Sequence, residues 1–309
     1  MSESPAPATV VTPGNHDGVH LGHRALLDAA RERAAPDGLT VTVLTFDPHP
    51  ARVLAPDRAP PLLTTLERRM RLLRDLGADR VEVLRFDRAR AGQAPEDFVR
   101  EVLVDRLRAR GLVVGPDFRF GRGAKGDAQT LRRMGGELGF DVREVGPVRL
   151  GGETVSSTRI RAALRDGDVA AASRLLGRLH DVDGTVVEGD RRGRTIGFPT
   201  ANLDCAPVLL PSDGVYAVVA RPLDGGELLR GVANLGVRPT VEAGRSVEAH
   251  FFDFGGDLYG QRLRLGFVAR LRGEQKFDGL EALKAQIDAD ARGARAALDE
   301  ADPERWAWI

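Results

Sequence analysis

The feature that most constrains the fold is a change of sequence pattern near residue 176. Up to that point, short runs rich in β-branched residues alternate with longer helical segments. The β-rich runs lie at residues 9–12, 39–46, 79–86, 112–115 and 141–145. Such alternation is typical of a parallel sheet with helices on both faces. We therefore predict an α/β domain whose ligands bind beyond the carboxyl ends of the strands.

Helices are predicted between these runs, and one of them has clear end signals. The predicted segments span residues 20–34, 64–76, 95–110 and 128–138. In the second segment, Thr64 and Glu67 have the spacing of a capping box, and Gly77 is the expected C-terminal cap. Gly111 is expected to end the third helix. The expected apolar face of the second helix carries Leu66, Met70 and Leu73.

After Leu176 the helical segments give way to strand-like runs separated by Gly, Pro and Asp. The runs lie at residues 181–190, 214–223, 228–237, 246–254 and 261–271. Strands at this spacing predict a small antiparallel β-barrel, and an amphipathic helix is expected to follow over 278–298. A chain of 309 residues is long enough for two domains. We place them at 9–180 and 181–309, with the boundary near 178–183.

Charge and residue usage exclude several kinds of site and partner. The 45 basic and 45 acidic residues balance, so we expect binding neither to nucleic acid nor to a membrane surface. None of the three lysines precedes Ser or Thr, which excludes a GK[ST] phosphate loop. Cys205 is the only cysteine, and no signal peptide or long apolar run is seen. We expect a soluble, cytoplasmic protein, and the sequence gives no indication of its oligomeric state.

The stretch GNHDGVHLGH, residues 14–23, follows the first predicted strand and opens the first predicted helix. His20 and His23 are three positions apart, so they share one face at the positive end of the helix dipole, where backbone N–H groups attract phosphate. Gly22 lets a ligand approach the main chain. Imidazoles at this place can bind nucleotide phosphates and stabilise a departing pyrophosphate.

Two other interpretations of this stretch stay open on the residues alone. It can be a polar turn with two satisfied histidines, because a bare HxGH is a short signal. It can also be a metal site formed by His16, Asp17 and His20, although no further cluster completes the ligand shell.

A second polar motif, SSTRIR, starts another predicted helix. Ser156, Ser157 and Thr158 offer hydroxyl groups at the helix start, and Arg159 and Arg161 can hold phosphate oxygens with planar guanidinium groups. Taken alone, the motif is more typical of a helix N-cap followed by a solvated basic helix.

Four motifs in this order and spacing resemble the adenylyltransferase half of the prokaryotic bifunctional riboflavin kinase/FMN adenylyltransferase (FAD synthetase) family. They are GNHDGVHLGH, FDPHP, VGPDFRFGRGAKGD and SSTRIR. The second half resembles the riboflavin kinase module of the same family through GRTIGFPTANLD, DGVYAVV, GVANLGVRPTV and VEAHFFDFGGDLYG. The resemblance covers nearly the whole chain, from residue 9 to residue 298.

The resemblance implies the fold and two reactions. It implies a Rossmann-like HxGH nucleotidyltransferase domain, then a riboflavin kinase-like barrel with one strand more than the five counted from the pattern, and a C-terminal helix. The barrel module is expected to transfer the γ-phosphoryl group of ATP to the ribityl 5′-hydroxyl of riboflavin, giving FMN. The first module is expected to join FMN to the α-phosphorus of a second ATP, giving FAD and pyrophosphate. ATP is the co-substrate of both steps, and Mg²⁺ is the expected cofactor.

In the barrel module, the implied roles fall on a turn and on a neighbouring strand. Thr200 and Asn202 are expected to hold Mg²⁺ and phosphate oxygens. Glu248 is the expected base, because an alcohol is a poor nucleophile near neutral pH. Without the family, the PTAN segment is typical of an ordinary turn, and Glu248 is one carboxylate among 45 acidic residues.

In the first module the nucleophile is a phosphate that is already ionised, so no base is required. His20, His23 and Arg161 are expected to supply alignment and positive potential instead. The ATP- and flavin-binding residues expected over both modules are Gly14, Asn15, Asp17, Gly22, Asp117, Ser156, Ser157, Thr158, Arg159, Gly197, Pro199 and Asn234.

Two other functions are weighed against this one. A different HxGH adenylyl- or cytidylyltransferase with a non-catalytic barrel would act on a phosphorylated substrate other than FMN, and the PTAN segment together with Glu248 argues against it. A flavin-binding regulator without turnover would need neither a base nor a phosphate clamp.

The chain departs from the family pattern at one position of the first motif. Where the family usually has an aromatic or other apolar residue, this chain has His16. The histidine can add a phosphate contact, alter how the flavin packs or replace the bulk of the usual ring. The closing DPERWAWI has no assigned role, and its Trp306 and Trp308 are expected to dock against the barrel.

Overall fold

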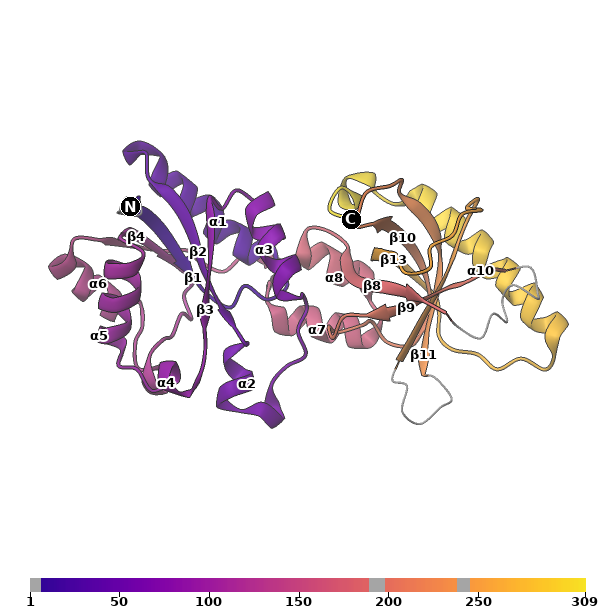
Figure 1. The fold of residues 1–309 in the computed structure, drawn as a ribbon, viewed down its shortest axis with the longest axis horizontal. Helices are drawn as coiled ribbons and strands as arrows, with labels where there is room; N and C mark the ends of the chain where they lie inside the picture. The colour runs from indigo at the N-terminus through magenta and orange to yellow at the C-terminus, as the bar shows by residue number, and fades with distance from the viewer. Residues whose placement is uncertain (1–6, 189–197, 238–244) are drawn as a thin grey trace. The chain divides into compact units, whose positions relative to one another are not determined.

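A parallel sheet with the strand order β3-β2-β1-β4-β5 forms the centre of the first half of the chain (Figure 1). The structure, a computed structural model, describes residues 7–188, 198–237 and 245–309. The strands are β1 (Thr9–Pro13), β2 (Thr40–Asp47), β3 (Arg80–Arg85), β4 (Ala109–Val114) and β5 (Asp141–Glu144). Every neighbouring pair is parallel, so the predicted α/β sheet is confirmed.

Helices cover both faces of this sheet because successive strand residues point to opposite sides. The helices are α1 (Leu21–Ala34), α2 (Pro50–Leu54), α3 (Leu66–Asp75), α4 (Arg88–Ala91), α5 (Pro95–Phe98) and α6 (Ala128–Leu138), and a π-helical segment over Val99–Arg106 continues α5. Val10 of β1 packs against the alanines of α1 on one face. Its neighbour Val11 packs on the other face, in a core with the π-helical segment and α6.

The start of α3 corrects a prediction. Thr65, not Thr64, is the N-cap, and its hydroxyl accepts the backbone N–H of Arg68 at 3.1 Å. Thr64 is buried and donates its hydroxyl to Asp17 instead. Gly77 follows the helix with φ +97°, as predicted. The buried face also differs from the expected one, because it carries Arg68, Arg69, Leu72 and Leu73.

The predicted helix over 95–110 is too long. The helical conformation ends at Arg106, and the chain turns at Arg108, whose φ is +54°. Gly111 therefore does not end a helix. It lies inside β4, where it pairs with Val10 of the neighbouring strand β1.

Six antiparallel strands close into a barrel in the second half, in the order β10-β11-β12-β9-β8-β13. The strands are β8 (His180–Val187), β9 (Ala201–Cys205), β10 (Gly214–Pro222), β11 (Leu229–Val237), β12 (Arg245–Phe251) and β13 (Arg262–Arg272). The barrel is confirmed with the strand count that the resemblance implied. The strand missed by pattern is β9, which is short and contains Asn and Asp, both poor strand formers.

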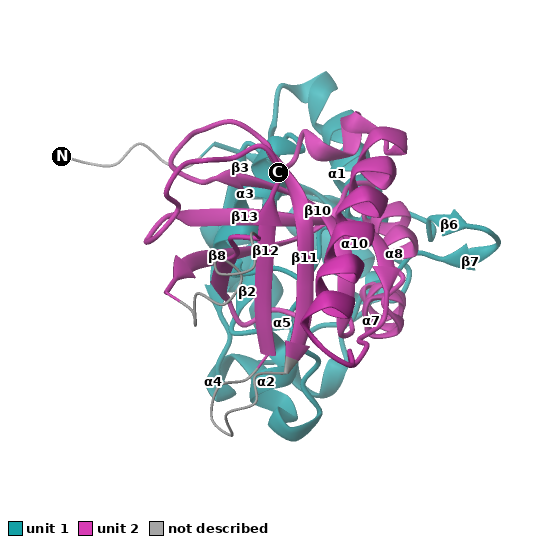
Figure 2. Cartoon of the chain, turned by 90° about the vertical axis from the view of Figure 1, so that its right-hand side faces the viewer, with its two compact units in different colours: residues 1–156 teal, residues 157–309 magenta. Residues whose placement is uncertain are grey.

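The C-terminal helix α10 (Leu280–Glu300) lies along the outside of the barrel against β10 and β11 (Figure 2). Val215 and Val232 of the barrel wall share an apolar core with Leu298 of the helix. The half-buried Trp306 packs against the same core, as expected for the chain end. Among the helices of the described residues, none combines the length and hydropathy that a membrane span requires.

Contacts divide the chain into two compact units, residues 1–156 and 157–309, coloured separately in Figure 2. Helices α7 (Ser157–Asp166) and α8 (Val169–Leu176) therefore group with the barrel. The domain limits of 9–180 and 181–309 stay a prediction.

Candidate active sites

The first candidate site lies where the strand order of the parallel sheet reverses. The chain goes from β1 to β2 on one side, and β4 then pairs with the other side of β1. Ligands of such sheets bind at this point, beyond the carboxyl ends of the strands. The loop that holds Gly14 and Asn15 follows β1, and the exposed Asp117 follows β4. The motif that holds Gly14 and Asn15 and the motif that holds Asp117 therefore follow adjacent strands, at the carboxyl edge of the sheet where a ligand is expected.

His20 and His23 stack at the start of α1. Their ring centroids are 3.7 Å apart, with 14° between the ring planes. His20 Nδ1 accepts the backbone N–H of His23 at 3.4 Å, and His23 Nδ1 accepts that of His20 at 3.3 Å. Because each Nδ1 accepts, the proton of each neutral ring is on Nε2. Both imidazoles thus present an N–H donor at the positive end of the helix dipole.

Gly22 packs closely against the His20 ring. A Cβ atom at position 22 would lie 3.0 Å from Cε1 of His20 and 3.1 Å from its Nδ1. Contacts of this length are tighter than ordinary packing, so a side chain at position 22 would require the His20 ring to shift by a few tenths of an ångström. The glycine of HxGH therefore makes room for the stacked histidines.

Asp17 ties the loop after β1 to the segment before α3. The backbone N–H of Leu63 donates to both carboxylate oxygens, at 3.0 and 3.1 Å, and that of Thr64 donates at 3.2 Å. Asp17 is 2% exposed. Its carboxylate therefore positions the loop, and its contact with a ligand stays a prediction. Within the described residues, no three His, Cys, Asp or Glu side chains are grouped to hold a metal, so the metal-site interpretation has no support.

His16 is buried next to His23, with 1% of its surface exposed and φ of +50°. Its Nδ1 lies 2.9 Å from the carbonyl oxygen of Gly14, which can only accept, so Nδ1 carries the proton. Its ring centroid lies 5.0 Å from that of His23. Burial lowers the pKa of His16 to about 4. The buried, neutral ring thus supports the interpretation that His16 replaces the bulk of the usual ring.

We predict that His16→Phe removes an acid sensitivity of the fold. The unfolded chain binds a proton at this residue near pH 6.5, whereas the folded chain binds it only near pH 4. The stability linked to His16 is therefore complete above pH 6.5 and is lost as the pH falls toward 4, by about 3 kcal/mol. Urea unfolding followed by circular dichroism measures this loss as the pH-dependent difference between the two proteins. A difference that stays constant from pH 7 to pH 4 would contradict the assignment.

Arg69 joins the loop after β1 to the end of β2, and the sequence did not reveal it. Its side chain is fully buried, and Nη1 donates to the carbonyl oxygen of Asn15 at 2.8 Å and to Thr45 Oγ1 at 3.2 Å. A longer contact of 3.4 Å reaches the carbonyl oxygen of Phe46. In the sequence Arg69 belongs to a run of charged residues that is typical of a solvated helix, so no local signal marks it.

The second candidate site is built by strand register on the outer wall of the barrel. Glu248 on β12 pairs with Asn234 on β11 and with Asn202 on β9. Directly opposed residues of antiparallel strands point to the same side of the sheet. The three polar side chains therefore form one row, and the strand that the pattern missed brings Asn202 into it.

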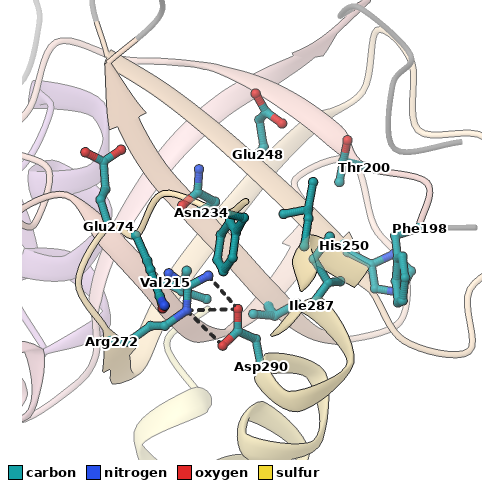
Figure 3. Close-up of a pocket in the computed structure, with 14 residues that line it drawn as sticks. Phe198, Thr200, Val215, Asn234, Glu248, His250, Arg272, Glu274, Ile287 and Asp290 are labelled. Carbon is teal, nitrogen blue, oxygen red and sulfur yellow. Dashed lines mark hydrogen bonds and ion pairs between the residues drawn. The ribbon is translucent and has the colours of Figure 1, made fainter. Parts of the chain in front are cut away.

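A cavity of about 400 Å³ adjoins this row, between the barrel wall and α10 (Figure 3). Its volume falls within the range of roughly 300–1,000 Å³ that is typical of small-molecule sites. Asp290 on α10 accepts hydrogen bonds from Arg272 Nε at 3.0 Å and Nη2 at 2.8 Å, which ties the helix to β13. The residues that line the cavity include Thr200, Asn234, Glu248, Phe198, Phe277 and Ile287.

Thr200 lies between this cavity and a smaller one. The second cavity has a volume of about 250 Å³ and is lined by the segment Phe254–Tyr259 as well as by Phe251. Thr200 lines both cavities, and Pro199 lines the smaller one. Two ligands, one in each cavity, would therefore meet at Thr200.

The remaining predicted residues are placed as follows. Ser156 is the last residue of the first unit, and Ser157 begins α7 in the second unit. Arg161 is 6% exposed, Arg159 is half-buried and Thr158 is exposed. Their role in phosphate binding stays a prediction. Gly197 lies outside the described residues.

Comparisons with known proteins identify the family of the chain. Family models match the chain at residues 2–159, as FAD synthetase, and at 176–298, as riboflavin kinase. The bifunctional riboflavin kinase/FMN adenylyltransferase of Escherichia coli (strain K12) is 44% identical, covering 96% of this chain and 94% of that protein. The protein of the same name from Bacillus subtilis (strain 168) is 37% identical, with 93% and 91% covered.

A solved structure extends the likeness to the fold. It is described as a macrolide-efflux protein from Streptococcus pneumoniae, is 32% identical and gives a TM-score of 0.86. The match covers 95% of each chain. With two family models and curated relatives that match over nearly their whole length, the chain belongs to the bifunctional riboflavin kinase/FMN adenylyltransferase family.

Proposed function

We propose that the chain converts riboflavin to FMN at the barrel site and FMN to FAD at the stacked-histidine site. Riboflavin, FMN and ATP are the substrates that its family implies. The observation that carries the proposal is the row of Asn202, Glu248 and Asn234 beside the larger cavity. It combines a carboxylate and two amides with a space of the size that a small ligand needs.

In the kinase step, Glu248 takes the proton of the ribityl 5′-hydroxyl. The oxygen attacks the γ-phosphorus of ATP, and ADP leaves. We assign riboflavin to the larger cavity, which Glu248 lines, and ATP to the smaller cavity. Thr200 lines both, so the γ-phosphoryl group passes it during transfer.

Mg²⁺ is proposed for this site on the chemistry of its donors. The hydroxyl of Thr200 and the amide oxygen of Asn202 are neutral oxygen ligands, of the kind that Mg²⁺ accepts together with phosphate oxygens. When bound there, the ion would neutralise part of the charge on the phosphates.

In the adenylyl step, the FMN phosphate attacks the α-phosphorus of ATP and pyrophosphate leaves. The Nε2–H groups of His20 and His23 donate to phosphate oxygens as negative charge builds up on the leaving group. We propose that Ser157, Thr158 and Arg161 are further phosphate-binding residues of the adenylyl step. Because FMN is already ionised, this site needs donors and no base.

We also propose that both steps take place in the cytoplasm, because each consumes ATP. Nucleic acid and membrane lipid have no part in either step, which accords with the balanced charge of the chain.

The direct test follows the flavins over time. Purified protein is incubated with riboflavin, ATP and Mg²⁺, and riboflavin, FMN and FAD are separated at intervals. We expect FMN first and FAD afterwards, with one ADP released for each FMN formed and one pyrophosphate for each FAD. A parallel reaction with EDTA tests the need for Mg²⁺, and one that starts from FMN isolates the second step. If neither FMN nor FAD forms from riboflavin, the kinase assignment is wrong. If FMN forms but FAD does not, the adenylyltransferase assignment is wrong.

A further inference from the structure

We infer that His250 is a positioning residue for phosphoryl transfer, which holds the turn at Pro199 and Thr200 in place beside Glu248. The inference rests on the proposed kinase site. His250 follows Glu248 by two residues on β12, so both side chains point to the same side of the strand. Both line the larger cavity, where Figure 3 shows His250 between Glu248 and α10 and next to Phe198.

A hydrogen bond connects His250 to the turn. Its Nδ1 lies 2.8 Å from the carbonyl oxygen of Pro199. A carbonyl oxygen only accepts, so Nδ1 carries the proton and donates it. Pro199 has no backbone N–H, and its carbonyl is the group through which a donor can hold this residue. The next residue is Thr200, which is proposed to meet the transferred phosphoryl group.

The bond continues the pairing of two strands beyond the point where their ladder ends. Strands β9 and β12 pair from Leu203 with Val247 to Ala201 with Ala249. Pro199 and Thr200 precede β9 and lie outside this ladder. The imidazole of the next residue on β12 therefore adds one link, which fixes the turn relative to the strand that carries the base.

Two aromatic rings hold the imidazole in its orientation. The ring centroid of Phe198 lies 5.7 Å from that of His250 at an interplanar angle of 78°, and that of Phe252 lies 5.9 Å away at 73°. Both are edge contacts, an arrangement that aromatic pairs prefer. Because Phe198 and Phe252 contact the imidazole on two sides, they help to keep it in the rotamer in which Nδ1–H donates to the carbonyl oxygen of Pro199.

Two variants separate positioning from other roles of the ring. In His250→Asn, the side-chain amide offers an N–H close to the position of Nδ1 but lacks the ring. In His250→Phe, the ring remains but the donor is lost. Both are made in the full chain, and kcat and KM for riboflavin are measured. The FMN adenylyltransferase activity of the same samples controls for active protein, and thermal unfolding of the barrel controls for its fold.

We expect His250→Phe to lower kcat for riboflavin phosphorylation by up to about 100-fold, with KM for riboflavin nearly unchanged, because a misplaced turn harms alignment more than binding. His250→Asn is expected to recover most of that loss. If His250→Phe keeps the wild-type kcat, or is more active than His250→Asn, the ring acts only by packing and the inference is wrong. Equal, severe losses in both would point to His250 as a base and would also overturn it. A wild-type protein that makes no FMN would instead refute the proposed function.

A double-mutant cycle with Thr200→Val gives a second test. If His250 acts through the turn, the loss of kcat caused by Thr200→Val is smaller in the His250→Phe background than in the wild type. Additive losses would show that His250 and the turn act independently, and would contradict the inference.

Discussion

Replacing Glu248 with Gln is expected to abolish FMN formation and to leave FAD formation from supplied FMN intact. General bases typically contribute about 100- to 10,000-fold to a rate, so kcat for the kinase step should fall within that range. The amide of Gln has the same shape as the carboxylate but cannot accept the hydroxyl proton. Because Glu248 belongs to the row with Asn202 and Asn234, the neighbouring donors stay in register and riboflavin binding should change little.

The measurement is the rate of FMN release from riboflavin and ATP, with FMN adenylylation assayed on the same preparation. Glu227→Gln is a matched control, because it removes the charge of an exposed glutamate in the second unit. That variant should phosphorylate riboflavin at the wild-type rate. A Glu248→Gln protein that still makes FMN at more than one tenth of the wild-type rate would refute the assignment of the base.

Replacing His20 with Ala is expected to give the opposite result, with FAD formation lost and FMN formation retained. Removal of one donor to a developing charge costs roughly 100- to 1,000-fold in rate. The substitution also removes the Nδ1 acceptor that caps α1, which costs about 1 kcal/mol of stability. The two effects can be separated, because the cap and the proposed phosphate donor are different nitrogens of one ring.

His20→Asn makes that separation. Asn is a favourable N-cap residue, so it retains the acceptor for the backbone N–H of His23 but has no counterpart of Nε2–H. We expect wild-type stability with the same loss of FAD formation as in His20→Ala. Thermal unfolding and FAD formation from FMN are the two readouts. If His20→Asn restored FAD formation, the histidine would be only a helix cap, and the phosphate-binding role would be wrong.

Much of the fold followed from local pattern, and the errors have local causes. The central strands β1, β2 and β4 are mostly buried on both faces and therefore stand out as continuous runs. Strand β9 did not stand out, because its five residues include Asn202 and Asp204, and Asn and Asp are poor strand formers. The predicted N-cap of α3 was wrong by one residue because two threonines are adjacent. Thr64 donates its hydroxyl to the buried Asp17, and Thr65 caps the helix.

The candidate sites divide in the same way. His20, His23 and Glu248 were predicted as site residues because each lies in a short motif that resembles one of the family. Arg69 and His250 were missed because their partners are distant in the chain: Arg69 contacts the loop after β1, and His250 contacts Pro199. The sequence around a charged residue in a helix, or around a histidine in a strand, does not indicate to which carbonyl oxygen the side chain will donate. Such contacts require the fold.

Because Asn202, Glu248 and Asn234 are aligned by strand register, the proposed kinase site should tolerate insertions between strands better than insertions within them. Neighbouring strands are held about 4.8 Å apart by their backbone ladder, so the spacing of the three groups is inherited from the barrel. Residues added to a loop between strands leave that spacing intact. One residue added inside β12 before Glu248 would instead turn its carboxylate into the barrel interior while most of the ladder could form again. In evolution or engineering, loops that line neither cavity can therefore change in length, but the strand that carries the proposed base cannot.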